Sequence, residues 1–310
     1  MPTKAYTYIA IDVSKDTLQV QSADGAEQVD VNAASLKKLT GRLARLANPL
    51  VALEATGGYE RPLLEALQSC GIPHCLLNPR RLRGFAQSEG LRAKSDPIDA
   101  RLILKFAEEK RLDPTPEPSA SQRELASWMD RRAHLSEQLT REKNRLQKAA
   151  SPIARQIQTM IDVLKEQLAE VDEAIETIIQ ADQQMRLEAK AMQTVLGVGP
   201  VTTWTILAYL SEIRFLQRGP LTALAGLAPY NRDSGKKQGK RYIQGGRAKV
   251  RRCLYMAART AAIHNPVIKA YVSRLVHERN KPFQCAITAA MRKLLLHLSS
   301  IVKNINYDLD

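Results

Sequence analysis

The chain has 310 residues, more than the roughly 250–300 at which one hydrophobic core stops growing, so more than one module is expected. An apolar fraction of 44%, a charged fraction of 25%, and only 15 Gly and 15 Pro exclude a disordered or collagen-like chain. Lys and Arg number 46 against 32 Asp and Glu, and the resulting net charge of +14 favours a polyanionic partner, nucleic acid first and an anionic membrane surface second.

Two further features of composition narrow the class of protein. Aromatic residues make up only 5% of the chain, which argues against a protein that holds single strands mainly by stacking bases. The four cysteines, Cys70, Cys75, Cys253 and Cys285, show no zinc spacing and are expected to be reduced thiols. No apolar run approaches the roughly 18 residues of a membrane span, and no signal peptide is evident. We therefore expect a cytoplasmic protein that associates with the nucleoid.

Residues 1–118 have the pattern of an α/β domain. Strands are predicted at Tyr8–Val13, Thr17–Gln21 and Glu27–Val31 and, after a helix over Ala34–Ala47, at Leu50–Glu54 and His74–Asn78. A second helix is predicted over Tyr59–Ser69. Early hairpins followed by strands that alternate with helices predict a mixed sheet flanked by helices. The proline-rich segment Asp113–Ser119 is predicted to be a linker.

Residues 119–195 are predicted to be helical. Apolar residues step by four and three along Ile157, Ile161, Leu164, Leu168, Val171, Ile175 and Ile178, and a weaker series runs through Leu125, Trp128, Leu135, Leu139 and Leu146. That spacing indicates a coiled coil or an antiparallel helical pair, and Ser151-Pro152 between the two series favours a helical hairpin. The alternative is a helix packed on the core of its own domain.

Residues 196–310 are predicted to form a helical domain that contains one long loop. Helices are expected at about Arg247–His264, Val267–Glu278 and Pro282–Lys303, and the loop covers Tyr230–Gly246. This segment holds 19 basic and 5 acidic residues, whereas residues 1–118 hold 16 and 15, and residues 119–195 hold 11 and 12. The whole excess of positive charge therefore belongs to the C-terminal segment, which we expect to bind the polyanion.

Four carboxylates in the N-terminal domain form a candidate metal site. Asp12 and Glu54 close two predicted strands, and Asp96 and Asp99 share one face at the start of a predicted helix. Carboxylate oxygens suit Mg²⁺, which assists phosphodiester chemistry. Helix capping alone would also explain Asp96 and Asp99, and Asp12 could simply start a turn. Glu54 is harder to explain structurally, because a carboxylate that closes an apolar strand needs a partner.

Ser234 lies in the basic loop of the C-terminal segment. A serine hydroxyl needs a base or a metal to become a nucleophile, and the loop supplies cations but no histidine. From its surroundings alone, Ser234 is better interpreted as part of a turn in a loop that binds phosphates. The cations expected to make those contacts are Arg232, Lys236, Lys237, Lys240, Arg241, Arg247, Lys249 and Arg251. Arg80, Arg81 and Arg83 could line a second phosphate track, or they could serve only solubility.

Several motifs resemble one family of proteins. Tyr8-Ile-Ala-Ile-Asp-Val-Ser-Lys, Leu53-Glu-Ala-Thr-Gly-Gly-Tyr, Asn78-Pro-Arg-Arg and Ala93-Lys-Ser-Asp-Pro-Ile-Asp-Ala-Arg are similar to the N-terminal half of the DEDD insertion-sequence transposases. Gly197-Val-Gly-Pro, Leu224-Ala-Gly-Leu-Ala-Pro, Asp233-Ser-Gly-Lys, Gly245-Gly-Arg and Leu254-Tyr-Met-Ala-Ala are similar to the C-terminal half. This is the IS-one-ten/IS-eleven-eleven family, related to the Piv DNA invertase and also called bridge recombinases.

The resemblance implies a fold and a mechanism. It implies an N-terminal RuvC-like domain with the RNase H fold, in which Asp12, Glu54, Asp96 and Asp99 bind Mg²⁺. It also implies that Ser234 is the nucleophile, against the expectation from spacing alone, and forms a covalent phosphoserine link to DNA. The family further implies a bridge RNA that pairs with target and donor DNA, and a homodimer or homotetramer assembled through the coiled coil of residues 119–195. In such a system base pairing reads the sequence and the protein contacts mainly the backbone.

Two other functions fit the residues. The chain could be a metal-dependent nuclease of the junction-resolvase type, in which Ser234 is structural. It could also be a coiled-coil protein that binds nucleic acid without catalysis, in which the carboxylates are helix caps. A covalent protein–DNA adduct that depends on Ser234 would distinguish the recombinase from both alternatives.

Overall fold

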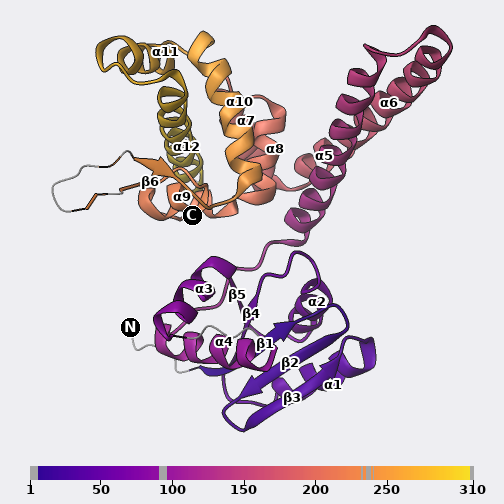
Figure 1. Cartoon of the computed structure of the whole chain (residues 1–310), viewed down its shortest axis with the longest axis vertical. Helices are drawn as coiled ribbons and strands as arrows, with labels where there is room; N and C mark the ends of the chain where they lie inside the picture. Colours follow the sequence, from indigo (N-terminus) through magenta and orange to yellow (C-terminus); the bar gives the residue numbers. More distant parts are fainter. Residues whose placement is uncertain (1–5, 91–95, 232, 235–238, 240, 308–310) are drawn as a thin grey trace. The chain divides into compact units, whose positions relative to one another are not determined.

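The computed structural model describes residues 6–90, 96–231, 233–234, 239 and 241–307, with the backbone alone described for 96–98 and 306–307. The chain divides into two compact units, residues 1–117 and residues 118–310. The first unit is α/β, and the second is built mainly from helices (Figure 1). Both observations agree with the fold class expected from the sequence.

The first unit is built on one mixed five-stranded sheet. Its strands are β1 (Thr7–Val13), β2 (Thr17–Ser22), β3 (Gly25–Asp30), β4 (Pro49–Glu54) and β5 (His74–Leu77). They lie in the order β3-β2-β1-β4-β5, with β2 antiparallel to both neighbours and β4 parallel to β1 and β5. This order and these directions are the arrangement of the ribonuclease H-like fold, so the fold implied by the family resemblance is confirmed.

Helices cover both faces of the sheet because alternate strand residues point to opposite sides (Figure 1). The helices are α1 (Ala33–Leu43), α2 (Arg61–Ser69), α3 (Pro79–Ser88) and α4 (Asp96–Lys110). Ile9 and Ile11 of β1 share a core with side chains of α1 and α2. Ala10, between them, shares the opposite core with Leu82 of α3 and Ile103 of α4. The even-numbered residues of β1 therefore face α3 and α4.

Two segments differ from the sequence-based expectations for local structure. The first helix ends at Leu43 rather than near Ala47, because the chain turns at Asn48 with a φ of 48° and Thr7 donates its backbone N–H to the Asn48 carbonyl at 2.9 Å. The proline-rich segment pairs with the outer edge of β5. Thr115 donates its N–H to the carbonyl of His74 at 2.8 Å, and its hydroxyl accepts from the N–H of Leu76 at 3.0 Å. An edge strand has unpaired backbone groups, and this segment satisfies two of them.

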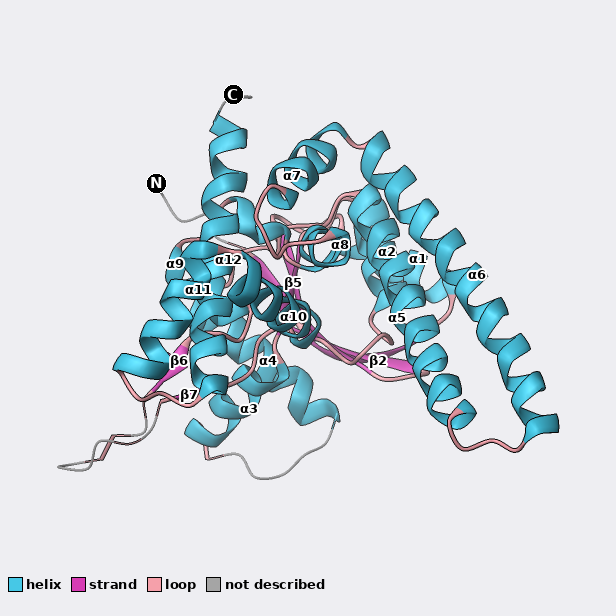
Figure 2. Ribbon diagram, turned by 90° about the horizontal axis from the view of Figure 1, so that it is seen from above, coloured by secondary structure: helices cyan, strands magenta, loops and turns pink. Residues whose placement is uncertain are grey.

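The second unit begins with a long helical hairpin. Helices α5 (Ala120–Leu146) and α6 (Ser151–Ala181) run side by side in both views (Figures 1 and 2). Arg132 of α5 donates to Asp172 of α6 at 2.6 and 3.2 Å. Trp128, one turn earlier on α5, lines one groove together with Ile178, which lies further along α6. Partners further along one helix thus lie earlier in the other, so the two helices are antiparallel. The predicted series on α6 is buried or half-buried along the hairpin.

The base of this hairpin shares one hydrophobic core with the helices that follow. These are α7 (Gln183–Gln193), α8 (Pro200–Tyr209), α9 (Arg218–Leu224), α10 (Ala248–His264), α11 (Pro266–Ser273) and α12 (Phe283–Tyr307), with a short 3₁₀ turn at Ser211–Arg214 and a π-helical turn at Arg274–Glu278. Leu125 of α5, Ile175 of α6, Leu254 of α10 and Leu294 of α12 all belong to that core. The predicted segments 119–195 and 196–310 therefore pack together.

The turn between α7 and α8 requires a glycine. Gly197 has a φ of +100°, and a Cβ at this position would lie 2.6 Å from the backbone and Cβ of Ala261 on α10. The Gly197-Val-Gly-Pro motif therefore lets the turn approach the backbone of α10.

Helix α12 is long and apolar enough to span a membrane, by length and composition alone. Its window Phe283–Ile305 has a mean hydropathy of 1.4, but 50% of that window is buried inside the fold. Leu294, Leu295 and Leu298 are completely buried in the core of the second unit. Because core helices of this kind pass the same test, the helix is weak support for a membrane span.

Candidate functional site

Asp12 and Glu54 lie at the same level on neighbouring parallel strands. The register of β1 and β4 pairs Ala10 with Ala52 and Ile11 with Leu53, and it brings Asp12 beside Glu54 at the next step. Paired residues of parallel strands point to the same face. Ala10 and Ala52 belong to the core beneath α3 and α4, so the two carboxylates project on that side of the sheet. Both side chains are half-buried.

Helix α4 brings the second pair of carboxylates to this face. It packs against β1 and buries Ile103, Phe106 and Ala107 in the same core. Asp99 lies one turn before Ile103 and is half-buried. Asp96 begins the helix, but its side chain lies outside the described residues. Three of the four predicted positions therefore come from elements that meet on one face of the sheet.

The donor set fits a hard divalent cation, because Asp12, Glu54, Asp96 and Asp99 supply only oxygen ligands. Within the part of the chain whose side chains are described, no three His, Cys, Asp or Glu groups lie close enough together to hold a metal ion. The side chain of Asp96 is not in that part. These residues would hold the metal if it binds at this edge of the sheet.

Glu60 stabilises the turn that follows Glu54 and is a residue that sequence analysis missed. One oxygen of its carboxylate accepts the hydroxyl of Thr56 at 2.7 Å, the N–H of Thr56 at 3.3 Å and the N–H of Gly58 at 2.8 Å. Burial favours a higher pKa for Glu60, but these hydrogen bonds outweigh it and lower the pKa. The signal in the sequence was an acidic residue two positions after the Thr-Gly-Gly segment.

The loop that carries Ser234 is anchored at both ends by glycines. Strands β6 (Pro229–Tyr230) and β7 (Tyr242–Ile243) pair to form its stem. Below the stem, Gly226 and Gly246 approach so closely that a Cβ on Gly246 would lie 2.1 Å from the backbone nitrogen of Gly226. Both have φ angles near +70°, which side chains disfavour. The glycines in the Leu224–Pro229 and Gly245–Arg247 motifs therefore fix the two ends of one hairpin.

Asp233 connects the two arms of this hairpin directly beside Ser234. Its carboxylate accepts from the guanidinium of Arg241 at 2.8 and 3.0 Å and from the N–H of Gly239 at 2.9 Å. The hydrogen bond from Arg241, followed by the one from Gly239, lowers the pKa of Asp233. Ser234 itself is exposed. The arrangement presents a serine hydroxyl to solvent on a hairpin whose arms are joined by an ion pair.

Some of the predicted phosphate-binding cations make contacts within the protein. Arg247 donates to both oxygens of Glu212 at 2.5 and 2.6 Å, and Arg251 donates to the carbonyl of Gly245 at 2.5 Å. Lys249 donates to Asp130 of α5 and lies over the ring of Tyr209, 4.4 Å from its centre. Together these contacts connect the start of α10 to α5, α8 and the hairpin stem. Arg232, Lys236, Lys237 and Lys240 lie outside the described residues.

The three arginines of the predicted second track are exposed on α3. Asn78 caps this helix by accepting the N–H of Arg80 at 2.9 Å, and Pro79 occupies the first turn. Arg81 lies over the ring of Phe106, 5.6 Å from its centre. Arg80 and Arg83 are exposed on the same helix. All three arginines are therefore accessible from solvent.

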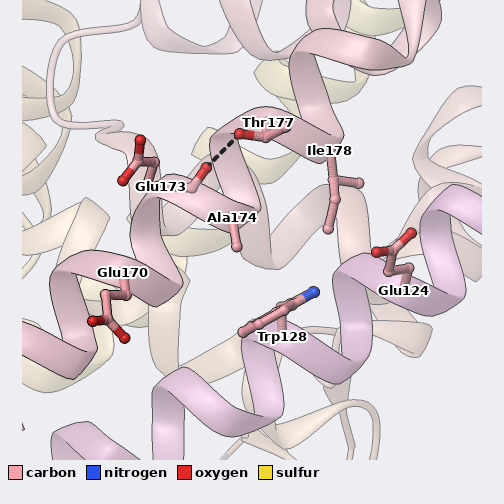
Figure 3. Close-up of a pocket in the computed structure, with 7 residues that line it drawn as sticks. All are labelled: Glu124, Trp128, Glu170, Glu173, Ala174, Thr177 and Ile178. Atoms are coloured by element: carbon pink, nitrogen blue, oxygen red, sulfur yellow. Dashed lines mark hydrogen bonds between the residues drawn. The ribbon is translucent and has the colours of Figure 1, made fainter.

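An open groove between α5 and α6 is a poor site for nucleic acid (Figure 3). It has a volume of about 400 Å³ and is lined by Glu124, Trp128, Glu170, Glu173, Ala174, Thr177 and Ile178. Its three glutamates would repel phosphates. None of the predicted catalytic residues lines this groove.

Sequence in both units matches transposase families. Residues 9–153 match a family described as Transposase, the DEDD transposases of the IS110 group, and residues 189–273 match the family described as Transposase IS116/IS110/IS902 family. Pilin gene-inverting proteins of Moraxella lacunata and Moraxella bovis are each 25% identical to the chain over 255 residues. Those matches cover 81% of this chain and 79% of each relative.

Among solved structures, the chain is similar to T. thermophilus RuvC in complex with a Holliday junction substrate. The match covers 35% of this chain and 98% of the RuvC chain, at 15% identity and a TM-score of 0.26. That score is too low to bear on fold or function.

Proposed function

Because the chain belongs to the IS116/IS110/IS902 family of transposases and is a DNA recombinase, we propose that it cuts and rejoins DNA through a covalent intermediate on Ser234. The observation that carries this proposal is the exposed position of Ser234 on a hairpin fixed by Asp233 and by Gly226 and Gly246. A nucleophile must be accessible and held in place, and this hairpin meets both requirements.

The proposed reaction conserves the energy of the phosphodiester bond. The Oγ of Ser234 loses its proton and bonds to phosphorus, and the bond from phosphorus to the 3′ oxygen breaks. The 3′ oxygen takes up a proton and leaves as a free hydroxyl. In the second step the 3′ hydroxyl of a different strand attacks the phosphoserine, and Ser234 regains its proton. Each step exchanges one ester for another, so rejoining needs no ATP.

Asp12, Glu54, Asp96 and Asp99 are proposed to hold Mg²⁺ at the edge of the sheet. When bound, Mg²⁺ neutralises charge that develops on phosphate oxygens. Asp12 and Glu54 contribute a pair of oxygen donors fixed by strand register, and α4 adds donors across the same face. Glu60 holds the turn after Glu54 and so limits the movement of that carboxylate.

The likeness to the pilin gene-inverting proteins supports strand exchange rather than cleavage alone. Inversion of a gene requires strands to be cut and joined to new partners. The shared sequence extends across 81% of this chain, and thus across parts of both units. A reaction that ends in rejoining is therefore the better proposal than hydrolysis, in which Ser234 would have only a structural part.

We further propose that a bridge RNA encoded beside the gene selects the DNA. Base pairing would then read the sequence, and the protein would contact mainly phosphates. The high positive charge and the low aromatic content of 5% support that division of labour. The proposed place of action is the cytoplasm, at the nucleoid.

Assembly into a dimer or tetramer is proposed to occur through the α5–α6 hairpin. Helix α6 exposes Ile153, Met160 and Val163, with exposed fractions of 57%, 51% and 43%. Their spacing of seven and three residues is that of a second apolar seam on the outer surface of the hairpin. A dimer formed there lets the carboxylates of one subunit act with the serine of another.

A substitution on that seam tests the assembly. We expect Met160→Glu with Val163→Glu to reduce the oligomer to a monomer in sedimentation at micromolar concentration. Glu166→Gln, an exposed position on the same helix, serves as the control and leaves the oligomer intact. An oligomer that survives the double substitution would rule out this seam as the interface.

The covalent step is tested with the full-length protein, DNA that carries the element end, the adjacent non-coding RNA and Mg²⁺. We expect a protein–DNA adduct that migrates slowly on a denaturing gel. Ser234→Ala abolishes the adduct, whereas Ser300→Ala, at an exposed position on α12, retains it. Asp12→Asn abolishes the adduct but retains RNA binding. Cleavage without an adduct in Ser234→Ala would support the metal-dependent nuclease instead.

A further inference from the structure

Positive charge in the second unit is distributed unevenly between paired and unpaired side chains. Before residue 250, several cations are paired with acids, as in Arg132 with Asp172, Arg214 with Glu188 and Arg247 with Glu212. Between Arg251 and Lys303 the sequence has ten basic residues and one acid, Glu278. No ion pair of the described part of the chain includes any of these ten. The last three helices and the turn between them therefore concentrate cations that have almost no acids nearby in the sequence.

Two of these cations converge on one aromatic ring. Arg274, at the end of α11, and Lys293, on α12, both lie over the ring of Tyr271, with their charged groups 5.6 and 4.5 Å from its centre. Both cationic side chains are exposed. The ring attracts each cation, but the two cations repel each other, and no described carboxylate pairs with either. Both charges are therefore available to an anion such as a phosphate.

The segment that follows the π-helical turn adds two more cations to the same corner. Arg279 donates its backbone N–H to the carbonyl of Arg274 at 3.2 Å, and Lys281 donates its N–H to the carbonyl of Leu275 at 3.0 Å. Asn280 between them has a φ of 47°, so the chain reverses there before α12 begins. Both side chains are exposed. Helices α11 and α12 also pack against each other, which keeps the turn beside them (Figure 1).

We propose that this surface, the α11–α12 corner formed by Tyr271, Arg274, Arg279, Lys281 and Lys293, binds the phosphate backbone of a nucleic-acid duplex. Four cations that share a corner without paired acids suit a line of phosphates, which carry one negative charge per nucleotide. The proposal rests on the proposed function only in that the partner is nucleic acid. The corner lies on different elements from the Ser234 hairpin and requires no strand cleavage.

A surface of this kind has a clear use in strand exchange. An enzyme that breaks a strand must hold the free ends until they are rejoined, and contacts restricted to the reacting phosphate cannot do so. Backbone contacts fix the position of a duplex without reading its sequence. The corner can therefore hold duplex DNA or the duplex parts of an RNA by the same chemistry, and the test below distinguishes these two sources.

Equilibrium binding of 30-base-pair duplexes by the full-length Ser234→Ala protein tests the corner. The variant Arg274→Gln/Lys281→Gln/Lys293→Gln removes three of its charges. If each charge contacts one phosphate, we expect binding to weaken at least about tenfold at 0.1 M salt and the salt slope to fall by about 2 to 3. A matched control, Lys37→Gln/Lys38→Gln/Arg45→Gln, removes three charges from exposed positions on and just after α1 and changes binding less than about threefold.

Parallel titrations with duplex DNA and duplex RNA of the same length identify the source of the phosphates. Weaker binding of the corner variant to only one kind of duplex supports the proposal and identifies that duplex as the partner. Weaker binding to both supports a site for the phosphate backbone of either duplex. Equal losses in the corner variant and in the α1 control would overturn the proposal, because the effect would then follow net charge alone. Unchanged duplex binding with lost binding to phosphatidylserine vesicles would also overturn it.

Two further variants separate binding from folding. Arg279→Gln/Lys281→Gln changes only exposed side chains of the turn and is expected to weaken binding about threefold to tenfold. Arg274→Lys/Lys293→Arg keeps both charges and is expected to keep binding within about threefold. Failure of the first variant to weaken binding contradicts the proposal. If the wild-type protein forms no adduct on Ser234 but still binds duplexes, the proposed reaction is contradicted and the proposal for the α11–α12 corner is unaffected.

Discussion

Asp12 and Glu54 are held by backbone pairing between strands, whereas Ser234 is held by a few side-chain and glycine contacts on a hairpin. The register of β1 and β4 aligns the two carboxylates on the face beneath α4, where their neighbours are buried. Ser234 depends on Asp233, Arg241 and the close approach of Gly226 and Gly246. The first arrangement resists change unless the sheet unfolds, while the second can be altered without disturbing the core.

The arrangement of Asp12 and Glu54 depends most on the hydrophobic core between the sheet and α4. Ile103→Ala removes a completely buried side chain, and we expect it to cost about 2–5 kcal/mol in the free energy of unfolding of the first unit. Ile103→Val is expected to cost only about 0.5–1.5 kcal/mol. Hydrogen exchange of the β1 and β4 amides measures this free energy.

The tryptophans provide an internal control for that experiment. Both Trp residues of the chain, Trp128 and Trp204, lie in the second unit. Their fluorescence therefore reports unfolding of that unit alone, and Ile103→Ala should leave it unchanged. A shift of the fluorescence transition as large as the change in exchange would show that the two units unfold together.

A substitution of Glu60 should destabilise the first unit less than Ile103→Ala does. Glu60→Gln removes a buried carboxylate that accepts three hydrogen bonds from the turn after Glu54, at a cost of about 1–3 kcal/mol. Glu65→Gln, at an exposed position on α2, is the matched control with little effect. We expect slower adduct formation in Glu60→Gln alone, because the turn that limits Glu54 is loosened. Equal rates of adduct formation for Glu60→Gln and Glu65→Gln would show that Glu60 does not position Glu54.

The lowered pKa of Glu60 also predicts a dependence on pH. A carboxyl whose folded pKa lies below its ordinary 4.5 contributes stability that is complete above that value and is lost as pH falls through the folded pKa. The stability difference between the wild type and Glu60→Gln should therefore shrink when pH is lowered from 7 to 3. Hydrogen exchange of β4 at both pH values measures it, and a constant difference would contradict the assigned hydrogen bonds.

The serine hairpin should respond in the opposite manner, with activity changed and stability unchanged. Asp233→Asn weakens the ion pair to Arg241 beside Ser234 and is expected to slow adduct formation about tenfold to a hundredfold. The melting temperature should not change, because Asp233 is exposed. Asp24→Asn, exposed in the first unit, serves as the control. A large fall in melting temperature would show that the hairpin supports the core.

Much of the sheet that carries Asp12 and Glu54 could be predicted from the sequence, because strands are recognised from short local runs of apolar residues. The nearly continuous apolar runs in Tyr8–Val13 and Leu50–Glu54 indicate both strands, and their ends place Asp12 and Glu54 at one edge. What the sequence could not supply was the register, which aligns the two residues at the same level. The role of Glu60 was also hidden, because it depends on which N–H groups the turn directs toward it.

The surroundings of the serine were harder to predict because the partners are distant in sequence. Arg247 and Lys249 were expected to contact phosphates, yet they meet Glu212 and Asp130, which lie 35 and 119 residues away along the chain. No spacing rule connects such positions. The count of charges located the basic segment correctly, but only the structure distinguished its paired cations from the unpaired ones at the α11–α12 corner.

The most direct test of the central claim is to identify the protein atom joined to DNA. The adduct is digested with nuclease and protease, and the peptides are sequenced by mass spectrometry. The account predicts a nucleotide joined through its 5′ phosphate to Ser234, with a free 3′ hydroxyl on the other DNA end. Cut DNA with a free 5′ phosphate and no modified peptide, or a nucleotide on any other residue, would contradict it.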